Sequence, residues 1–403
     1  MKPKVLPAFM ADVQRRMDRL QNDLEFVKNH MSSYLGGEIG LTHLIDETPI
    51  YINTNDFGCP ANFINGGRYE EEYLAVLASF RKPNSVFLDI GANLGVYSLR
   101  MAPLLRRGRI LAFEPNARIR ELLARSIHLN GMAERIAVFP CGASDRDRLV
   151  RLAVPEAHAG GGSIAESGFG AKGMRVEVRR LDGLLPDLSH FHIAKIDVEG
   201  HELHVLRGMT ELIRRSPEAI ILFEKLSVRS GIEGGLLDLL SGLGMSVYAI
   251  DGSTLALVDL AGLEARGGYF LAARSSTVGD RLQRNFICLY PDDLYPIGAT
   301  LADGRLVAAT QPRQTGAILF HGPYWFLARG TYNLHIDGDI ATDVSLTVAE
   351  KFGYAVREFV VTPEMRQFDF AVERDLTQWE IVARTTGERA EFSIDAVRLT
   401  RLG

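Results

Sequence analysis

Acidic residues and glycines recur where short apolar segments end, a pattern that suits the binding of a small cofactor. Residues 85–95 read SVFLDIGANLG, an apolar run that ends in Asp89 and enters a turn containing Gly91 and Gly95. Glycines let the backbone approach a ligand closely, and a helix that begins there offers free N–H groups to an anion. Asn93 stands where the GxGxxG motif has its middle glycine, so the pattern disfavours nicotinamide and flavin dinucleotides.

A second acidic residue, Glu114, ends the next apolar segment, in the sequence AFEPN. A carboxylate at such a strand end can accept both hydroxyls of a ribose, which is how many α/β sheets hold adenosine. An isolated acidic residue at a strand end is more often a helix cap or a solvated charge. The adjacent glycine turn favours the ribose interpretation.

A third charged group lies in the sequence KIDVEGHE at residues 195–202. Side chains alternate along a strand, so Lys195, Asp197 and Glu199 are predicted to project to one face. One interpretation is a buried structural ion pair between Lys195 and Asp197. The other, which we favour, is an active site, because paired carboxylates lie beside a cofactor-binding turn.

Strands that alternate with helices must position these groups, and the pattern from residue 67 to about 275 predicts a parallel α/β sheet. The predicted strands are 85–90, 109–114, 135–143, 192–198, 219–224, 246–250 and 268–273, and the predicted helices are 94–105, 117–130, 201–216 and 233–243. The glycine-rich stretch 157–173 is predicted to be a loop beside a hairpin, either a lid over the substrate or a plain connection.

The regions on both sides of this sheet have other patterns, as expected for 403 residues. Apolar residues between Met10 and Tyr34 follow heptad spacing, so residues 1–36 are predicted to form a helix that joins subunits as a coiled coil. An amphipathic helix packed on its own domain is the alternative. Residues 37–66 form a connecting or cap segment, residues 67–278 the α/β domain, and residues 279–403 an antiparallel β sandwich or jelly roll.

An aromatic run, FHGPYWF at residues 320–326, lies in the predicted β domain. Aromatic rings beside polar groups can stack on sugars, so a carbohydrate-binding role is one interpretation. We expect most of these rings to fill the sandwich core instead, because large apolar side chains are more often buried.

Composition excludes several classes of function. A net charge of −5 provides no basic field for nucleic acid. The three cysteines form no metal-binding or disulfide pattern, and no apolar stretch is long enough to cross a bilayer. These features predict a cytoplasmic protein without a membrane span or a structural zinc site.

The motifs FLDIGANLG, AFEPN, GASD and KIDVEGHELHVLRG together resemble the FkbM family of S-adenosylmethionine-dependent methyltransferases. The resemblance covers about residues 67–275, and Tyr69-Glu70 resembles the tyrosine-glutamate pair that precedes the first strand in this family. It implies a class I fold, which is a doubly wound, Rossmann-like sheet of seven strands. It also implies S-adenosylmethionine as cofactor and S-adenosylhomocysteine as product.

The resemblance also assigns residues to the cofactor. The glycine turn would surround the methionine part, Glu114 would hold the ribose, Ser144 and Asp145 would border the adenine, and Asp197 would lie near the amino or sulfonium group. The complete predicted set is Glu70, Asp89, Gly91, Ala92, Asn93, Gly95, Glu114, Pro115, Ser144, Asp145 and Asp197.

The implied reaction is methylation of an acceptor hydroxyl whose proton is taken by Asp197, Glu199 or His201, with Lys195 as a fourth catalytic candidate. A divalent metal held by Asp197 and Glu199 is not excluded. We expect the acceptor to be a saccharide, either a nucleotide sugar or a surface glycan. The enzyme would then take part in polysaccharide biosynthesis. The alternatives are a polyketide or other secondary-metabolite hydroxyl, and a non-catalytic scaffold whose β domain binds a glycan.

Overall fold

The computed structural model describes residues 16, 32–56, 58–64, 67–155, 162–164, 173–226, 233–251, 254–279, 286–308, 315–350 and 354–402. The predicted N-terminal coiled coil therefore lies outside the described residues, apart from Arg16, which is helical. At the end of that prediction the structure differs, because Ser33–Gly36 form a strand and not the last turn of a helix.

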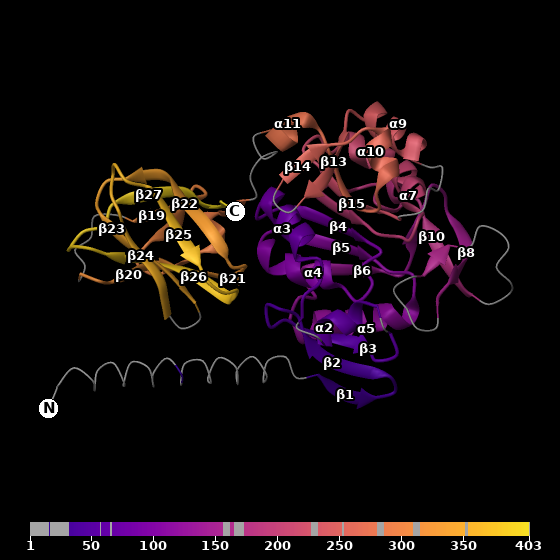
Figure 1. Ribbon diagram of the computed structural model, residues 1–403, viewed down its shortest axis with the longest axis horizontal. Helices are drawn as coiled ribbons and strands as arrows, with labels where there is room; N and C mark the ends of the chain where they lie inside the picture. The colour runs from indigo at the N-terminus through magenta and orange to yellow at the C-terminus, as the bar shows by residue number, and fades with distance from the viewer. Residues whose placement is uncertain are drawn as a thin grey trace.

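The α/β domain is built on one eight-stranded sheet (Figure 1), with the strand order β14-β13-β15-β12-β11-β4-β5-β6. The strands are β4 (Val86–Ile90), β5 (Arg109–Phe113), β6 (Ile136–Phe139), β11 (Ile193–Ile196), β12 (Ile220–Lys225), β13 (Ser246–Asp251), β14 (Thr254–Leu257) and β15 (Gly268–Ala273). All seven predicted strands are present, but two features differ from the prediction. Strand β15 runs antiparallel to both neighbours, so the sheet is mixed, and β14 adds an eighth strand as a hairpin from β13.

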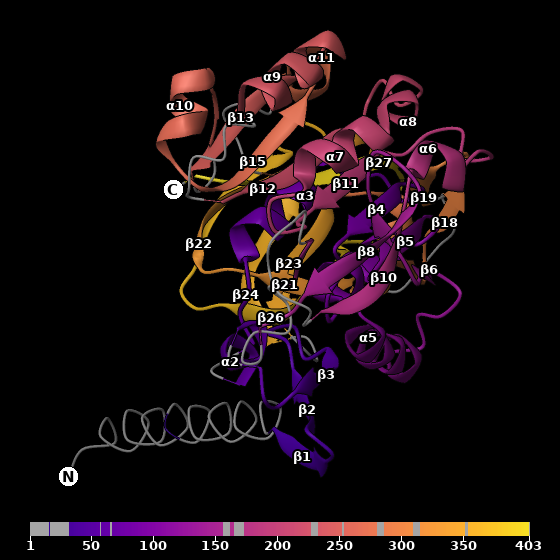
Figure 2. The same cartoon turned by 90° about the vertical axis from the view of Figure 1, so that its right-hand side faces the viewer.

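Helices cover both faces of this sheet (Figures 1 and 2), and each face has its own apolar core. One face carries α3 (Glu71–Phe80), α4 (Val96–Met101), η1 (Ala102–Leu104) and α5 (Ala117–Leu129). The other carries α6 (Leu181–Leu184), α7 (Glu202–Gly208), α8 (Thr210–Arg214), α9 (Glu233–Gly242) and α10 (Leu260–Ala265). Helix α11 (Ser275–Val278) ends the domain. Strands that are apolar on both faces are what a sheet covered on both sides requires.

Two smaller sheets flank the main one. Residues 37–66, predicted as a connecting or cap segment, contribute to an antiparallel sheet of β1 (Ser33–Gly36), β2 (Ile39–His43) and β3 (Pro49–Asn53), followed by α2 (Cys59–Ile64). The predicted strand 135–143 is broken: its second part, β7 (Gly142–Ala143), leaves the main sheet. It joins β8 (Arg148–Ala153), β9 (Ser163–Ile164) and β10 (Met174–Arg179) in a four-stranded sheet.

The C-terminal part consists of two antiparallel sheets that pack face to face as a β sandwich. One six-stranded sheet holds β16 (Phe286–Leu289), β18 (Thr300–Ala302), β19 (Arg305–Ala308), β22 (Gly330–Ile340), β25 (Gln367–Val372) and β27 (Phe392–Arg401). The other holds β17 (Tyr295–Pro296), β20 (Ile318–His321), β21 (Pro323–Leu327), β23 (Val344–Glu350), β24 (Tyr354–Val361) and β26 (Leu376–Thr385). A short helix, η3 (Pro291–Asp293), follows β16, and the two sheets enclose one apolar core that includes Phe320 and Trp379.

The sandwich is attached to the α/β domain by a buried ion pair. The guanidinium of Arg81, which follows α3, donates from Nη2 to Asp293 Oδ2 and to the carbonyl oxygen of Cys288, both at 3.0 Å. Arg81 and Asp293 are 1% and 0% exposed. Within the described residues, no helix is long and apolar enough to cross a membrane.

Candidate active site

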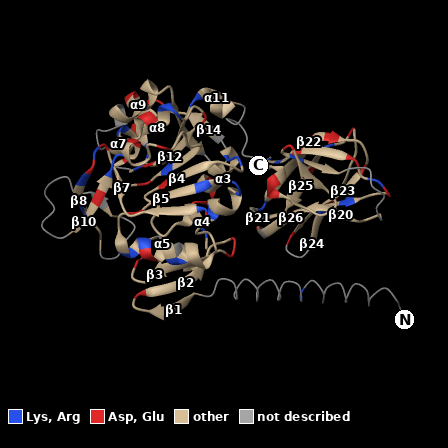
Figure 3. Cartoon of the chain, turned by 180° about the vertical axis from the view of Figure 1, so that it is seen from behind, with Lys and Arg blue, Asp and Glu red and all other residues tan. Residues whose placement is uncertain are grey.

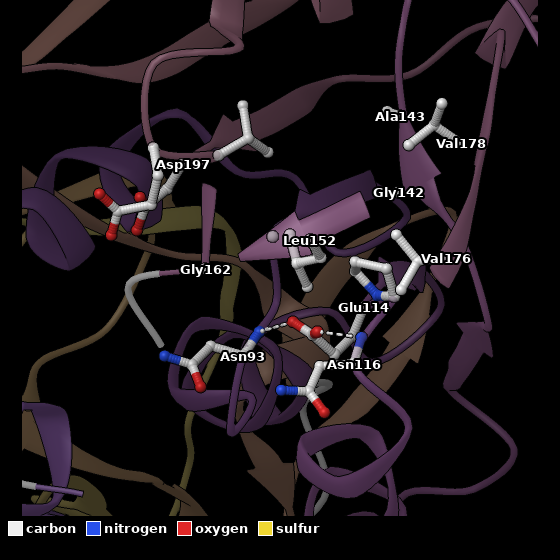
Figure 4. Close-up of a pocket in the computed structure, with 14 residues that line it drawn as sticks. Asn93, Glu114, Asn116, Gly142, Ala143, Leu152, Gly162, Val176, Val178 and Asp197 are labelled. Carbon is white, nitrogen blue, oxygen red and sulfur yellow. Dashed lines mark hydrogen bonds between the residues drawn. The ribbon is translucent and has the colours of Figure 1, made fainter. Parts of the chain in front are cut away.

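A pocket lies at the carboxyl ends of β4, β5 and β11, where an open α/β sheet binds its ligands. It brings together residues from the three strand ends that the sequence singled out and residues from the β8–β10 hairpin (Figure 4). The lining consists of Gly91, Asn93, Glu114, Pro115, Asn116, Gly142, Ala143, Leu152, Gly162, Val176, Val178, Asp197, Val198 and Glu199. One wall is acidic or polar, and the wall formed by the hairpin is apolar.

Glu114 is held in one orientation by the two turns beside it. Its Oε2 accepts the backbone N–H of Asn93 at 2.9 Å, and its Oε1 accepts that of Asn116 at 2.7 Å, as Figure 4 shows. Burial raises the pKa of the carboxyl to about 7, although the two N–H groups and Arg120 favour its charged form. Each carboxylate oxygen has a second lone pair, so Glu114 can still accept two hydroxyl donors from a ligand.

Asp197 is held in place by two hydrogen-bond donors. Its Oδ2 accepts from Lys195 Nζ at 2.8 Å and from the hydroxyl of Tyr269 at 2.9 Å. Burial disfavours the charged carboxylate, but the Lys195 ammonium and these hydrogen bonds keep the pKa of Asp197 below its usual value. Lys195 and Asp197 thus form the buried ion pair of the first interpretation, and Asp197 also lines the pocket, so the active-site interpretation stays a prediction.

Glu199 and Glu224 complete an acidic group with Asp197. Each offers a carboxylate oxygen, and the three oxygens lie within 4.8 Å of one another. Burial raises the pKa of Glu224 to about 9, and the charge of Asp197 and a hydrogen bond to it add to this rise. Carboxylates are the ligands that hard divalent cations prefer, so this group has the chemistry to hold one.

The glycine turn after β4 is shaped by close contact with β11. A Cβ on Gly91, whose φ is +78°, would lie 1.9 Å from the carbonyl oxygen of Asp197. Asp89, two residues before Gly91, is fully buried, and its Oδ2 accepts a hydrogen bond from Ser98 at 2.6 Å. Its Oδ1 has no hydrogen-bond donor among the described residues. Burial raises the pKa of Asp89 even though Lys195 is near.

Several predicted site residues do not line the pocket. Lys195 lies beneath it, 4% exposed, with Nζ 4.9 Å from the ring centroid of Tyr97. Glu70 also lies outside the lining, where its carboxylate accepts hydrogen bonds from the hydroxyls of Tyr97 and Tyr269. Ala92 and Gly95 shape the turn: the N–H of Ala92 donates to the carbonyl of Phe113, and Gly95 begins α4.

The predicted adenine residues and His201 form a separate contact. Ser144 is fully buried, and its hydroxyl lies 2.9 Å from Nε2 of His201 and 3.2 Å from Oδ1 of Asp145. The His201 ring also stacks on His204, with centroids 4.3 Å apart. The structure thus does not bring His201, Ser144 or Asp145 into the described pocket lining, which includes the preceding residues Gly142 and Ala143.

Sequence reasoning missed the residues that complete the pocket and its support. Glu224 ends a predicted strand, so the strand-end criterion that selected Asp89, Glu114 and Asp197 had the signal to find it. The apolar residues Leu152, Val176 and Val178 carried no such signal, because a hairpin outside the main sheet brings them to the pocket. The predicted lid falls largely outside the described residues, although Gly162 within that stretch lines the pocket.

Comparisons with known proteins identify the family of this chain. Residues 89–244 match the family described as the methyltransferase FkbM domain. Methyltransferase sdnD from Sordaria araneosa is 30% identical over 190 residues, which cover 38% of this chain and 73% of that protein. AMB antimetabolite synthetase AmbE from Pseudomonas aeruginosa is 30% identical over 199 residues, but the match spans only 9% of that protein and 40% of this chain.

The similarity to solved structures is low. Methyltransferase FkbM from Methylobacillus flagellatus KT is 17% identical with a TM-score of 0.32, and the match covers 47% of this chain and 44% of that one. The O-methyltransferase TomG from Streptomyces achromogenes, crystallised in complex with SAM, is 18% identical with a TM-score of 0.31, and the match covers 51% of this chain and 79% of that one.

Proposed function

The chain belongs to the FkbM methyltransferase family, and we propose that it transfers a methyl group from S-adenosylmethionine to a hydroxyl of a saccharide. The observation that carries the proposal is the pocket in which Glu114, Asp197 and Glu199 meet at the ends of adjacent strands. These carboxylates and the apolar hairpin match the three parts of the cofactor, which are a diol, a cationic end and an adenine ring.

The pocket residues fit this cofactor on chemical grounds. Glu114 keeps lone pairs for the two ribose hydroxyls while backbone N–H groups fix its orientation. Val176, Val178 and Leu152 offer an apolar wall to the adenine. The acidic group of Asp197 and Glu199 would hold the cationic end, because opposite charge favours binding. The cofactor, when bound, supplies an electrophilic methyl group on a sulfonium.

We propose Glu199 as the group that takes the proton of the acceptor hydroxyl. Asp197 is a weaker candidate, because the donors Lys195 and Tyr269 lower its basicity. The contact between His201 and Ser144 and the absence of His201 from the described pocket lining argue against His201 as the base. Lys195 then acts by holding the carboxylate of Asp197 in position. Most of the rate would come from aligning two bound reactants, and proton transfer would add about 100- to 10,000-fold.

The attached sandwich supports a saccharide acceptor. Of the aromatic run, Phe320 is buried in the sandwich core as expected, whereas Trp325 remains half-buried on β21. Exposed aromatic rings beside polar groups are typical of sugar-binding proteins. A second candidate, a secondary-metabolite hydroxyl, is favoured by the match to a segment of an antimetabolite synthetase.

A methyl-transfer assay tests the proposal and separates the candidates. The full chain is incubated with labelled S-adenosylmethionine and either nucleotide sugars and oligosaccharides or polyketide alcohols, with and without EDTA. We expect label in the saccharides and formation of S-adenosylhomocysteine. Label in the alcohols alone would favour the second candidate. Cofactor binding without turnover on any acceptor would support a scaffold and contradict the proposal.

A further inference from the structure

A second cavity, of about 980 Å³, lies between the α/β domain and the β sandwich. Helices α3 and α4 line one side, and strands β21, β22 and β27 with the turn before β26 line the other. It shares no lining residue with the pocket at the strand ends. In Figure 3, charged residues of both signs lie along the facing sides of the two domains. Domain interfaces are a common location for ligand sites of this size.

The lining of this cavity includes a buried cation with unused donors. Arg81 is 1% exposed, and only its Nη2 finds acceptors, on Asp293 and Cys288. Its Nε and Nη1 are buried and have no hydrogen-bond partner among the described residues. A buried donor without an acceptor is costly, so oxygen atoms of a ligand in the cavity would remove that cost.

An aromatic platform lies next to this cation. The guanidinium carbon of Arg81 is 4.4 Å from the ring centroid of Trp325, which is half-buried and lines the cavity. This cation–π contact favours one orientation of the indole ring. The apolar faces of an indole are suited to stacking against the C–H face of a sugar ring.

The charges of the lining indicate a neutral, polyhydroxylated ligand. Six arginines and five aspartates or glutamates line the cavity, so neither sign dominates. Several already pair with each other, as Arg100 does with Asp46 and Glu71. Arg329 and Glu373, both exposed, have no ion pair with any described residue and remain a donor and an acceptor for a ligand. Hydroxyl groups both donate and accept hydrogen bonds, whereas a phosphate or a carboxylate would require an excess of cations.

We propose that this cavity binds a saccharide, which stacks on Trp325 and is held by Arg81, Arg329 and Glu373. The site goes beyond the proposed methyl transfer, because it lies outside the transfer pocket and needs no cofactor. A saccharide bound here would connect the two domains, since its contacts come from both.

The protein contains two tryptophans, Trp325 and Trp379, which makes fluorescence a direct test. The full chain is first applied to an array of neutral, amino-sugar and uronic-acid oligosaccharides, and the glycans that bind are then titrated while tryptophan emission is recorded. Trp379 is fully buried in the sandwich core, so a change in emission reports on Trp325. Inorganic phosphate serves as the competing anion.

The variants Trp325→Ala and Glu373→Gln should weaken glycan binding, the first by about tenfold, as expected for loss of an aromatic stack. Glu373 is exposed, so its substitution is not expected to disturb folding. Glu388→Gln and Arg389→Met, at exposed positions of the sandwich outside the lining, should bind as the unaltered protein does.

Three outcomes would overturn the proposal: no glycan bound by the full chain, glycan binding that the cavity variants do not change, or binding of phosphate in place of glycans. Glu114→Gln should abolish methyl transfer and leave glycan binding intact. Failure of methyl transfer therefore does not imply failure of this site, and the reverse also holds.

Discussion

At the scale of single residues, Glu114 is the group that we propose to hold the ribose of the cofactor. Because burial raises its pKa to about 7, the free protein carries a mixture of protonated and ionised carboxyl at neutral pH. Only the ionised form can accept two backbone N–H groups and two ribose hydroxyls together. Binding of the cofactor should therefore favour ionisation, and protonation of Glu114 should oppose binding.

We predict that the affinity for S-adenosylmethionine is constant above the pKa of Glu114 and falls as pH decreases through about 7. The loss should approach about tenfold per pH unit, as one linked proton requires. Calorimetric titration at several pH values measures this dependence. Glu114→Gln should bind weakly at every pH, without the same dependence. A flat profile for the unaltered protein would contradict the assignment of Glu114 to the ribose.

The second prediction concerns the carboxylates that follow β11. Glu199→Gln should lower kcat by about 100- to 10,000-fold, because a general base is lost, and should change cofactor affinity little. His201→Asn, the matched control, should keep most of the activity, because the His201 ring contacts Ser144 and is absent from the described pocket lining. Steady-state kinetics on both variants tests this, and a larger loss of kcat in His201→Asn would assign the base to histidine.

At the scale of the elements, the glycine turn after β4 brings the ends of two strands together. Gly91→Ala places a Cβ 1.9 Å from the carbonyl of Asp197, so the turn or β11 must move. Gly131 is the matched control, because its φ is also positive, at +64°, and nothing lies within 4 Å of its Cβ position. We expect Gly131→Ala to cost about 1–2 kcal/mol from backbone strain alone.

Gly91→Ala should cost clearly more than Gly131→Ala and should also weaken cofactor binding. Chemical denaturation of the two variants gives the difference in unfolding free energy, and calorimetry gives the cofactor affinity. Equal destabilisation of both variants with unchanged cofactor binding would show that the contact between the turn and β11 is unimportant.

Strand positions could be predicted from the sequence, because apolar runs bounded by glycines mark them directly. Alternation along β11 also predicted that Lys195 and Asp197 share a face, as their 2.8 Å contact requires. Alternation does not reveal how deeply a side chain is buried, so it could not predict that Lys195 is buried and absent from the pocket lining. The antiparallel direction of β15 and the departure of β7 from the main sheet depend on long-range pairing, which local patterns do not contain.

At the scale of the whole molecule, the two domains are joined through the buried pair of Arg81 and Asp293. Asp293→Asn should destabilise the protein by about 3–5 kcal/mol, because it leaves the buried guanidinium without its counter-charge. Thermal denaturation measures this loss, and Asp292→Asn, whose partner Arg107 is 62% exposed, is the control with a small expected effect. A similar small effect of both substitutions would mean that the pair does not hold the domains together.

The N-terminal heptads remain a prediction about assembly. Because residues 33–36 belong to β1, only residues before them can form the proposed coiled coil. Removal of residues 1–31 should lower the molecular mass measured by light scattering and leave cofactor affinity unchanged. An unaltered mass would contradict self-association through this segment.

The central claim is that S-adenosylmethionine binds at the carboxyl ends of β4, β5 and β11. A crystal structure of the full chain with S-adenosylhomocysteine tests it most directly. We predict that both ribose hydroxyls donate to Glu114, with the adenine against Val176 and Val178 and the sulfur on the side of Asp197 and Glu199. A ligand bound elsewhere, or a ribose without contact to Glu114, would contradict the claim.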